Sequence, residues 1–388
     1  MDPERLREAA AAFEIPGRWL SSARFGSGHI NDTFLAVFED AGRTTRWVQQ
    51  RINRAVFADP AALMENVVRV TEHQRRALLG AGVREPEPRR LLRAGAPAPE
   101  RRALRLVPAR AAGFAYADHD GELWRTFHFI EGASSRDVVR APSEARLAAE
   151  AFGRFQGQLA DLPPPRLHET IPRFHDARAR FEALLDAARA DARGRLRDCR
   201  AELEFVCARE AAVDRLRTLC EKGALPERIT HNDTKVNNVL FDDATGEALC
   251  VIDLDTVMPG LALYDFGDLV RTATSPAAED ERDLSKVDLD PAMFAALVGG
   301  YLAGAAFLTS AERAELAFSG LLMTLVVGIR FLTDHLRGDV YFRIHRPDHN
   351  LDRCRTQLRL VASIERQRDR LEAIVAGGGE VSSGRRDP

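Results

Sequence analysis

One short segment of this sequence combines a carboxylate, a cation and an amide at fixed spacing. Asp233, Lys235 and Asn238 stand in the order D-x-K-x-x-N, directly before an apolar run. Twenty residues after Asp233, Asp253 follows a run typical of a buried strand, where an uncompensated carboxylate is costly. Phosphoryl transfer from a nucleotide needs a carboxylate that accepts the proton of the incoming hydroxyl, oxygen ligands for Mg²⁺ and a cation near the transferred phosphate. The order and spacing of these residues predict that chemistry.

The surrounding region is acidic in a chain that is otherwise balanced. Residues 231–268 contain eight acids, one lysine and no arginine, whereas the whole chain has 55 Lys+Arg against 58 Asp+Glu and a formal net charge of −3. From charge alone, a solvated acidic loop is the simpler interpretation. The apolar flanks favour a site that binds cations, and the nearly neutral chain gives no electrostatic reason to expect a nucleic-acid partner.

A glycine-rich turn precedes this segment by about two hundred residues. Gly26, Ser27 and Gly28 stand at the front of two predicted strands, Arg24 to Phe38 and Arg46 to Ile52. Such a turn can bring backbone N–H groups close to phosphates, although by itself it is more typical of a plain hairpin. The presence of the catalytic segment favours the phosphate-binding role.

The second of these strands lacks the lysine that kinases use to bind phosphate. Only three lysines occur, none before Lys222, so the strand offers Gln50 or Arg51 instead. Arg51 would keep a positive charge and a forked donor, whereas Gln50 would keep only hydrogen bonding. Alternation along a strand places these two side chains on opposite faces, and the sequence leaves open which one faces the nucleotide.

The elements that must position these residues change in character along the chain. The first 130 residues predict an antiparallel sheet, with further strands at Leu104 to Tyr116 and Leu123 to Ile130, and one helix that begins at Asp59 and ends near Gly80. The remainder is mainly amphipathic helix, interrupted by a short hairpin. The predicted helices are Pro142 to Leu159, Phe174 to Cys220 with a break at Gly194, Pro291 to Leu302, Ala311 to Leu336 and Leu351 to Val375, and the hairpin strands are Asn238 to Phe241 and Ala248 to Leu254.

These elements predict an α+β fold of two domains, in which residues 1–130 bind the nucleotide, residues 131–376 carry the catalytic loop and substrate site, and residues 377–388 form a flexible tail. Five cysteines without a C-x-x-C pair indicate neither a disulfide framework nor a zinc ribbon. The charged N-terminus lacks an apolar targeting region, and the longest apolar run, Gly320 to Ile329, falls short of the ~20 residues that span a bilayer. A cytoplasmic protein without a membrane partner is expected.

Four separated blocks make the sequence similar to the aminoglycoside phosphotransferase and choline kinase superfamily. The blocks are Phe25 to Thr33, His231 to Asn238, Ile252 to Gly260 and Gly328 to Asp334. The resemblance covers most of the chain and tightens to bacterial N-acetylhexosamine 1-kinases. It implies a protein-kinase-like, bilobal fold and transfer of the ATP γ-phosphoryl group to the anomeric hydroxyl of N-acetylglucosamine or N-acetylgalactosamine, giving the sugar 1-phosphate.

The resemblance also implies roles for individual residues. Asp233 would be the catalytic base and Lys235 would lie near the γ-phosphate. Asn238 and Asp253 would bind Mg²⁺, with Asp255 as a ligand for a second ion. Asp265 resembles the acid that braces the catalytic loop, so the Asp-Phe-Gly at 265–267 is not expected to be the metal motif.

Further residues are implied at the nucleotide and sugar sites. Glu131, in Phe129-Ile130-Glu131-Gly132, would belong to the hinge whose backbone pairs with adenine. Arg330 and Tyr341 are the expected sugar contacts, together with His29 after the glycine turn and the base Asp233, because hydroxyl and acetamido groups need directional hydrogen bonds. His175 also lies in a similar stretch, but no role is predicted for it.

Two alternatives to the sugar kinase remain open. The first is a small-molecule kinase for another hydroxyl compound, such as an aminoglycoside, a choline-like amine or a different sugar. The second is a nucleotide-binding regulator without catalytic activity, which the missing lysine suggests and the intact Asp233, Asn238 and Asp253 oppose. The sequence does not distinguish a monomer from a dimer.

Overall fold

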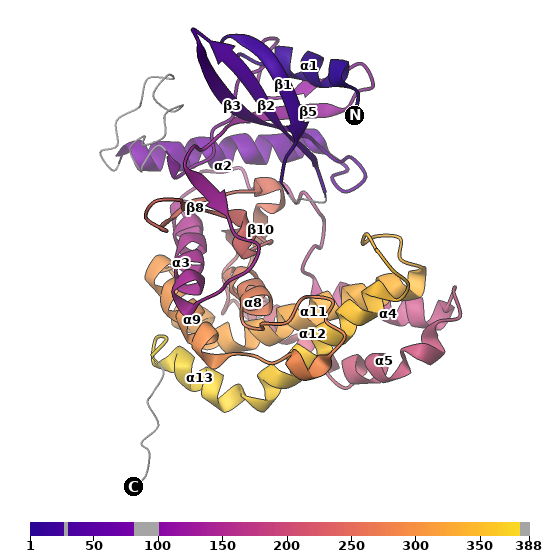
Figure 1. The fold of residues 1–388 in the computed structure, drawn as a ribbon. Coiled ribbons are helices and arrows are strands. Elements are labelled where there is room, and N and C mark those ends of the chain that lie inside the picture. The colour runs from indigo at the N-terminus through magenta and orange to yellow at the C-terminus, as the bar shows by residue number, and fades with distance from the viewer. Residues whose placement is uncertain (27–29, 81–100, 381–388) are drawn as a thin grey trace. The chain divides into compact units, whose positions relative to one another are not determined.

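The computed structural model describes residues 1–26, 30–80 and 101–380, and they form two compact units (Figure 1). The first unit consists of Met1–Ser135, Gln158–Pro172 and Val239–Met258, and the second of Arg136–Gly157, Arg173–Asn238 and Pro259–Pro388. The chain therefore enters the first unit three times, which differs from the single cut expected at residue 130. The reason is a strand pairing: β6 (Ala133–Ser135) hydrogen-bonds to β8 (Val239–Asp242), which draws the later hairpin into the first unit.

The first unit contains a five-stranded antiparallel sheet in the order β1-β2-β3-β5-β4. Its strands are β1 (Arg18–Arg24), β2 (Asp32–Asp40), β3 (Arg43–Arg51), β4 (Tyr116–Ala117) and β5 (Leu123–His128). Every second residue of β2, from Phe34 to Phe38, is buried, as expected for a strand with one face in a core. Helix α1 (Pro3–Ala11) covers that face, where Leu6, Ala9 and Ala10 join the same hydrophobic core (Figure 1).

Two sequence expectations for this unit need correction. Helix α1 was not expected, although Asp2 caps it by accepting a hydrogen bond from Glu4 N and Pro3 occupies its first turn, which are recognisable start signals. The predicted strand Leu104 to Tyr116 is not formed: apart from β4, this stretch makes only isolated bridges at Leu106 and Ala109. Its backbone pairs at separate points with β5 and the end of α1 instead of along one strand.

The rest of the first unit agrees more closely with expectation. Helix α2 (Pro60–Gly80) begins where Asp59 and Pro60 predicted a start, and the predicted hairpin forms as β8 and β9 (Ala248–Val251). Asp242 shapes the hairpin turn by accepting hydrogen bonds from Ala244 N and Thr245 N. The hairpin and β6 make a three-stranded sheet, after which the short helix η4 (Leu254–Thr256) begins.

The second unit is helical, as predicted. Its longest helix, α11 (Leu316–Arg337), packs against α12 (His349–Arg366), α8 (Ala262–Ala273) and α4 (Ala177–Ala190) (Figure 1). The other elements are α3 (Pro142–Gln158), η2 (Leu196–Asp198), α5 (Arg200–Cys207), α6 (Glu210–Val213), α7 (Arg215–Glu221), η3 (Val236–Asn238), η5 (Leu284–Lys286), α9 (Pro291–Gly304), α10 (Ser310–Ala314) and α13 (Arg368–Ala376), with β7 (Arg228–Thr230) paired to β10 (Met258–Gly260). The break expected at Gly194 occurs, with the glycine at φ +64°.

Helix α11 has the length and apolar composition of a membrane-spanning helix. However, 83% of its most apolar window is buried inside the protein, and the helix forms the centre of the second unit. A long apolar helix that is covered by its neighbours is typical of a protein core.

Glycines let helices α3 and α9 cross at close range. A Cβ on Gly300 would lie 2.1 Å from the carbonyl oxygen of Arg146, and a Cβ on Gly304 would lie 2.3 Å from that of Glu150. Only glycine fits at such contacts. The crossing positions two side chains, Gln156 of α3 and Tyr301 of α9, that support the catalytic segment.

Candidate functional site

The predicted catalytic residues lie together on a loop of the second unit. The loop follows β7 and ends in η3. Oδ1 of Asp233 lies 2.9 Å from Nζ of Lys235. Nδ2 of Asn238 donates to the backbone carbonyl of Asp233 at 2.8 Å and to its Oδ2 at 3.1 Å. The D-x-K-x-x-N spacing therefore brings all three polar groups into contact, and the Asp233 side chain remains 23% exposed.

The electrostatics of this loop keep Asp233 ionised. Burial raises the pKa of the Asp233 carboxyl, but the charge of Lys235 and its hydrogen bond outweigh burial and hold the pKa below the ordinary value. The charge of Asp233 in turn raises the pKa of Lys235. An ionised carboxylate is the form that a proton acceptor requires.

Helix α8 braces the loop through two acids in successive turns. The carboxylate of Asp265 accepts hydrogen bonds from the backbone N–H groups of His231 at 2.9 Å and Asn232 at 2.7 Å. Asp268 accepts one from Thr234 N at 3.1 Å. These contacts confirm the bracing role expected for Asp265. The Asp-Phe-Gly at 265–267 lies inside α8, where a Cβ on Gly267 would lie 2.4 Å from the carbonyl oxygen of Ser319 in α11, so this glycine serves helix packing.

A second layer of polar side chains holds Asp265 in turn. Nε2 of Gln156 donates to the Asp265 carboxylate. The hydroxyl of Tyr301 bridges Oε1 of Gln156 at 3.0 Å and the carbonyl of Ala262 at 2.8 Å. The close crossing of α3 and α9 thus holds Asp265 in place, and Asp265 in turn holds the catalytic loop.

Sequence reasoning missed two supports of the same loop. His175, for which no role was predicted, contacts the carbonyl of Asn232 through Nε2 at 2.9 Å, and burial lowers its pKa to about 4. A neutral imidazole therefore donates this hydrogen bond. Arg271 lies 2.7 Å from Asp268 and 2.9 Å from Glu279. Its position three residues after Asp268 on the same helix was the available signal.

The predicted sugar-binding residues Arg330 and Tyr341 also meet in the second unit. The Arg330 guanidinium lies over the rings of Phe174, Tyr341 and Phe342, 4.9 to 5.6 Å from their centroids, and its Nη2 is 3.4 Å from the Tyr341 hydroxyl. No acid among residues 1–26, 30–80 and 101–380 forms an ion pair with Arg330. Burial lowers its pKa, whereas the charge of Asp233 raises it.

The first unit carries the two acids that follow β9. Asp253 adopts a left-handed conformation at φ +62° and its side chain is exposed. Such backbone strain in a residue other than glycine is most often found at functional sites. Asp255 is 2% exposed and lies 2.5 Å from Nη1 of Arg125 and 2.5 Å from Nδ2 of Asn31. The two acids therefore have different surroundings, and those of Asp255 differ from what the resemblance implied for a metal ligand.

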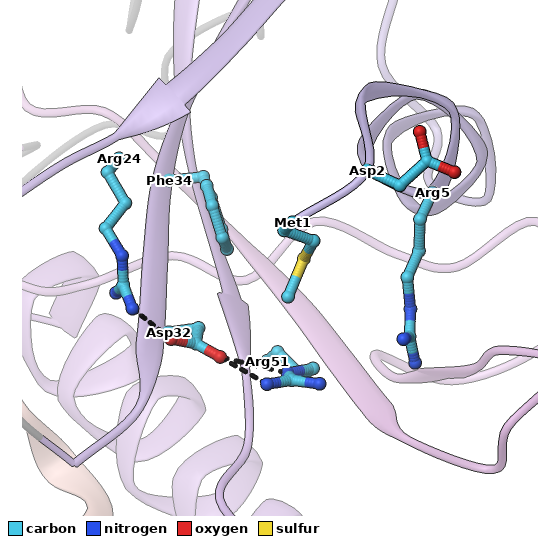
Figure 2. A pocket seen from close by; sticks show the side chains of 7 residues that line it. All are labelled: Met1, Asp2, Arg5, Arg24, Asp32, Phe34 and Arg51. Carbon is cyan, nitrogen blue, oxygen red and sulfur yellow. Dashed lines mark hydrogen bonds and ion pairs between the residues drawn. The ribbon is translucent and has the colours of Figure 1, made fainter.

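The side chains of Gln50 and Arg51 point to opposite faces of strand β3. Oε1 of Gln50 accepts hydrogen bonds from Nε and Nη2 of Arg125 at 3.0 and 2.8 Å, so Gln50 faces the side of Asp255. Arg51 faces the side of α1, where its Nε donates to Asp32 at 3.1 Å. Figure 2 shows Arg51 and Arg24 on either side of Asp32, in a pocket of about 400 Å³ that Met1, Asp2, Arg5 and Phe34 complete.

The remaining nucleotide-site residues fall into two groups. Glu131 lies between β5 and β6, where it pairs with Arg46, which itself covers the ring of Phe129 at 4.2 Å. Gly26 adopts φ +78° with open space around its α-carbon, as a turn glycine requires. Ser27, Gly28 and His29 lie outside the described residues.

Mg²⁺ binding depends on the oxygen donors that the chain offers. In the parts of the chain that the structure describes, no three His, Cys, Asp or Glu side chains form a metal cluster. A Mg²⁺ that bridges nucleotide phosphates takes only one or two carboxylates from the protein and keeps several waters. Each unit offers one donor of this kind: the exposed carboxylate of Asp253 in the first unit, and in the second the amide oxygen of Asn238, whose nitrogen is already bonded to Asp233.

Comparison with known proteins shows where this arrangement belongs. Residues 22–306 match the phosphotransferase enzyme family. An aminoglycoside phosphotransferase from Alicyclobacillus acidocaldarius is 14% identical with a TM-score of 0.56, over 98% of this chain and 96% of that chain. A choline kinase from Cryptosporidium parvum is 13% identical with a TM-score of 0.55, over 96% and 98%. APH(2")-IIia, solved with GDP and kanamycin, is 13% identical with a TM-score of 0.51, over 96% and 99%.

At these identities the solved structures establish the fold, and the predicted protein-kinase-like architecture, with an antiparallel sheet in one unit and helices in the other, is confirmed. The family match spans more than half of the sequence and includes Asp233, Asn238 and Asp253. The chain belongs to the phosphotransferase enzyme family.

Proposed function

We propose that the protein is an ATP- and Mg²⁺-dependent sugar kinase that phosphorylates the anomeric hydroxyl of an N-acetylhexosamine, N-acetylglucosamine or N-acetylgalactosamine. The four sequence blocks that resemble N-acetylhexosamine 1-kinases support this substrate class. Membership of a phosphotransferase family supports the reaction type, and the GDP held by APH(2")-IIia is in keeping with a nucleotide donor.

The observation that carries the proposal is the charge of Arg330. Its guanidinium is stacked on three aromatic rings and forms no ion pair with an acid in the described chain. The ring of Phe174 contacts both Arg330 and His175, and Nε2 of His175 contacts the carbonyl of Asn232 next to Asp233, so the cation lies in the same region of the second unit as the proposed base. A guanidinium without an acidic partner favours an acceptor that offers oxygen atoms, such as hydroxyl or acetamido groups.

The same observation disfavours the cationic alternatives. Aminoglycosides and choline-like amines carry positive charges, which a neighbouring guanidinium would repel when both are shielded from water. A site for such acceptors needs acids to balance the ammonium groups. The two acids that contact the catalytic loop are already engaged: Asp265 and Asp268 bind the loop backbone, and Asp268 also pairs with Arg271.

In the proposed reaction, Asp233 accepts the proton of the anomeric hydroxyl as that oxygen attacks the γ-phosphorus, and ADP leaves as the bond between the γ-phosphorus and the β–γ bridging oxygen breaks. Lys235, 2.9 Å from Asp233, keeps the carboxylate ionised and supplies positive charge beside the transferred phosphate. The side-chain amide of Asn238 donates hydrogen bonds to the backbone carbonyl and to Oδ2 of Asp233, and these bonds fix the orientation of the Asp233 carboxylate. Positioning and charge stabilisation of this kind account for most of the catalysis in phosphoryl transfer.

Asn238 and Asp253 are the residues proposed to hold Mg²⁺. The bound ion would neutralise charge on the phosphate oxygens of the nucleotide. The role of Asp233 depends on contacts within the chain. Lys235, Asn238 and the braced loop backbone hold its carboxylate in place as the proton acceptor.

A panel of acceptors tests the proposal directly. N-acetylhexosamines, other hexoses, aminoglycosides and choline-like amines are incubated with MgATP or MgGTP, and products are identified by ³¹P NMR. We expect an anomeric phosphate signal only with N-acetylhexosamines. Phosphorylation of an aminoglycoside or an amine alone would contradict the substrate class, and nucleotide binding without any turnover would favour the non-catalytic regulator.

A matched pair of arginine variants tests the contribution of Arg330. Arg330→Gln should raise KM for the acetylated sugar by about 10- to 100-fold, the value of one charge-assisted hydrogen bond, and leave KM for ATP unchanged. Arg209→Gln is the control, because Arg209 also stacks on a ring, that of Phe205, but is paired with Glu365 at 2.7 Å. Equal effects of the two variants would show that Arg330 acts through packing alone.

A further inference from the structure

We infer that the guanidinium of Arg125 takes the place that a second divalent ion would occupy on the Asp255 carboxylate, so that the acidic turn binds one ion, through Asp253. The inference rests on the proposed function, because it concerns the metal site of that same reaction. It replaces the second-ion role that the resemblance implied for Asp255.

Strand pairing places Arg125 opposite Gln50, one of the two residues that stand where kinases usually carry a lysine. Arg125 of β5 is the direct cross-strand partner of Gln50 of β3, and cross-strand partners share a face of the sheet. Nε and Nη2 of Arg125 donate to Oε1 of Gln50, which turns Nη1 toward Asp255. The guanidinium is 1% exposed, and its position is therefore fixed by protein contacts.

The Asp255 carboxylate is occupied at both oxygens. Oδ1 lies 2.5 Å from Nη1 of Arg125, and Oδ2 accepts a hydrogen bond from Nδ2 of Asn31 at 2.5 Å. The side chain is buried, and Thr170 fixes its backbone by donating to the Asp255 carbonyl at 2.7 Å. An ion would have to displace a guanidinium to bind here.

The contact between Arg125 and Asp255 has the character of an ion contact. Nη1 and Oδ1 are close, but neither atom completes a well-aligned hydrogen bond. The attraction is therefore largely between the charges, as it would be for a metal ion. Asp253, two residues earlier, has an exposed side chain on a left-handed backbone, whereas Asp255 is buried and paired with a guanidinium.

The same pairing explains why β3 lacks a lysine. The neutral amide of Gln50 accepts two hydrogen bonds from Arg125 and gives one to Thr33 Oγ1 at 3.1 Å. A lysine at this position would place a second cation beside a buried guanidinium. Gln50 on β3 and Arg125 on β5 thus act together: Gln50 orients the guanidinium, and Arg125 supplies the positive charge that β3 lacks at this position.

Manganese scattering locates the ions directly. Crystals of the full chain are grown with Mn²⁺ and a non-hydrolysable ATP analogue, and an anomalous difference map is calculated. We expect a peak within coordination distance of Asp253 and none at the Asp255 carboxylate. A peak at Asp255 would overturn this inference while leaving the proposed function intact. With the analogue bound, absence of a peak at both acids would overturn the inference together with the proposed metal site.

Substitution of Arg125 provides a second test in solution. In Mn²⁺ titrations followed by electron paramagnetic resonance, Arg125→Gln should increase the number of bound ions per chain from one to two, because it frees the Asp255 carboxylate. Arg101→Gln is the matched control: Arg101 and Asp242 form a guanidinium–carboxylate pair at the same 2.5 Å distance in the same unit, and its loss should leave the number at one. An unchanged number in a folded Arg125→Gln protein would count against the inference, as would two ions in the wild type with one located at Asp255 by the anomalous map.

Discussion

Two buried aspartates, one in each unit, are held in opposite ways. Asp255 in the first unit is balanced by a charged guanidinium, that of Arg125. Asp265 in the second unit is held by two backbone N–H groups and the amide of Gln156. The first arrangement neutralises a carboxylate and so sets the charge of the acidic turn. The second uses a carboxylate to fix a backbone path and so sets the shape of the catalytic loop.

The pKa of Asp265 reflects this difference. Burial raises the pKa of its carboxyl, and the His231 imidazole together with the backbone hydrogen bonds from His231 and Asn232 opposes the increase. A buried carboxylate that several groups stabilise together depends on each of them being in place. The catalytic loop and its brace therefore support each other.

The largest expected effect is on kcat and comes from Asp233, which lies on the loop that Asp265 braces. Asp233→Ala should lower kcat by about 10²- to 10⁴-fold, because the proton acceptor is lost, and should leave nucleotide affinity largely unchanged. Initial rates and calorimetric titration with nucleotide measure the two quantities. Asp186→Ala, at an exposed acid of α4, is the control, and near wild-type turnover of Asp233→Ala would refute the assignment of the base.

Breaking the ion pair between Arg125 and Asp255 should have the largest effect on stability. Asp255→Asn removes the partner of a buried guanidinium and should lower the free energy of unfolding by about 3–5 kcal/mol. Adding Arg125→Gln removes the unpaired charge and should recover part of that loss. Denaturant unfolding of the single and double variants measures the coupling. Strictly additive losses would mean that the two charges do not interact.

The same substitution at the second aspartate should cost less. Asp265→Asn keeps one acceptor oxygen and directs an amide group toward a backbone N–H, so we expect a loss of about 1–3 kcal/mol. The amides of His231 and Asn232 should exchange hydrogen faster in this variant, and kcat should fall. Asp265→Asn could instead lower the free energy of unfolding as much as Asp255→Asn does, without faster exchange of these amides. That result would contradict the distinction between the two aspartates.

The loss of stability in acid is an effect that both units should share. Burial lowers the pKa of His128 in the first unit to about 3 and that of His175 in the second unit to about 4. The unfolded chain binds these protons near pH 6.5, so their contribution to stability is complete above that pH and is lost as the pH falls toward 4. Between these limits each histidine should reduce stability by about 1.4 kcal/mol per pH unit.

Single substitutions separate the two histidines. His128→Gln and His175→Gln should each reduce the slope of unfolding free energy against pH by one proton between pH 6 and 4. At pH 8 neither change in slope should be visible. If His175→Gln left the slope unchanged, His175 would be protonated in the folded protein, and its hydrogen bond to the Asn232 carbonyl would need another explanation.

Local signals in the sequence predicted much of the catalytic loop and little of its support. The D-x-K-x-x-N spacing brought Asp233, Lys235 and Asn238 together because a short loop cannot separate them. His175 lies 57 residues before Asn232, whose carbonyl it contacts, and Gln156 lies 109 residues before Asp265, so only folding reveals these supports. The strand expected at Leu104 to Tyr116 was wrong: apolar residues occurred at strand spacing, but the stretch makes isolated bridges, from Leu106 to Phe127 and from Ala109 to Phe13.

Position along the chain and residue type determined the proposed reaction: an acid, a cation and an amide within six residues, followed by an acid after a buried strand. The alternation of β3 also determined that Gln50 and Arg51 point to opposite sides. Only the tertiary structure decided that Gln50 faces Asp255 and that Arg125, from a strand far along the sequence, provides the charge there. The physical reason is that a buried charge must be balanced by whatever group lies within a few ångströms, and sequence distance does not limit which group that is.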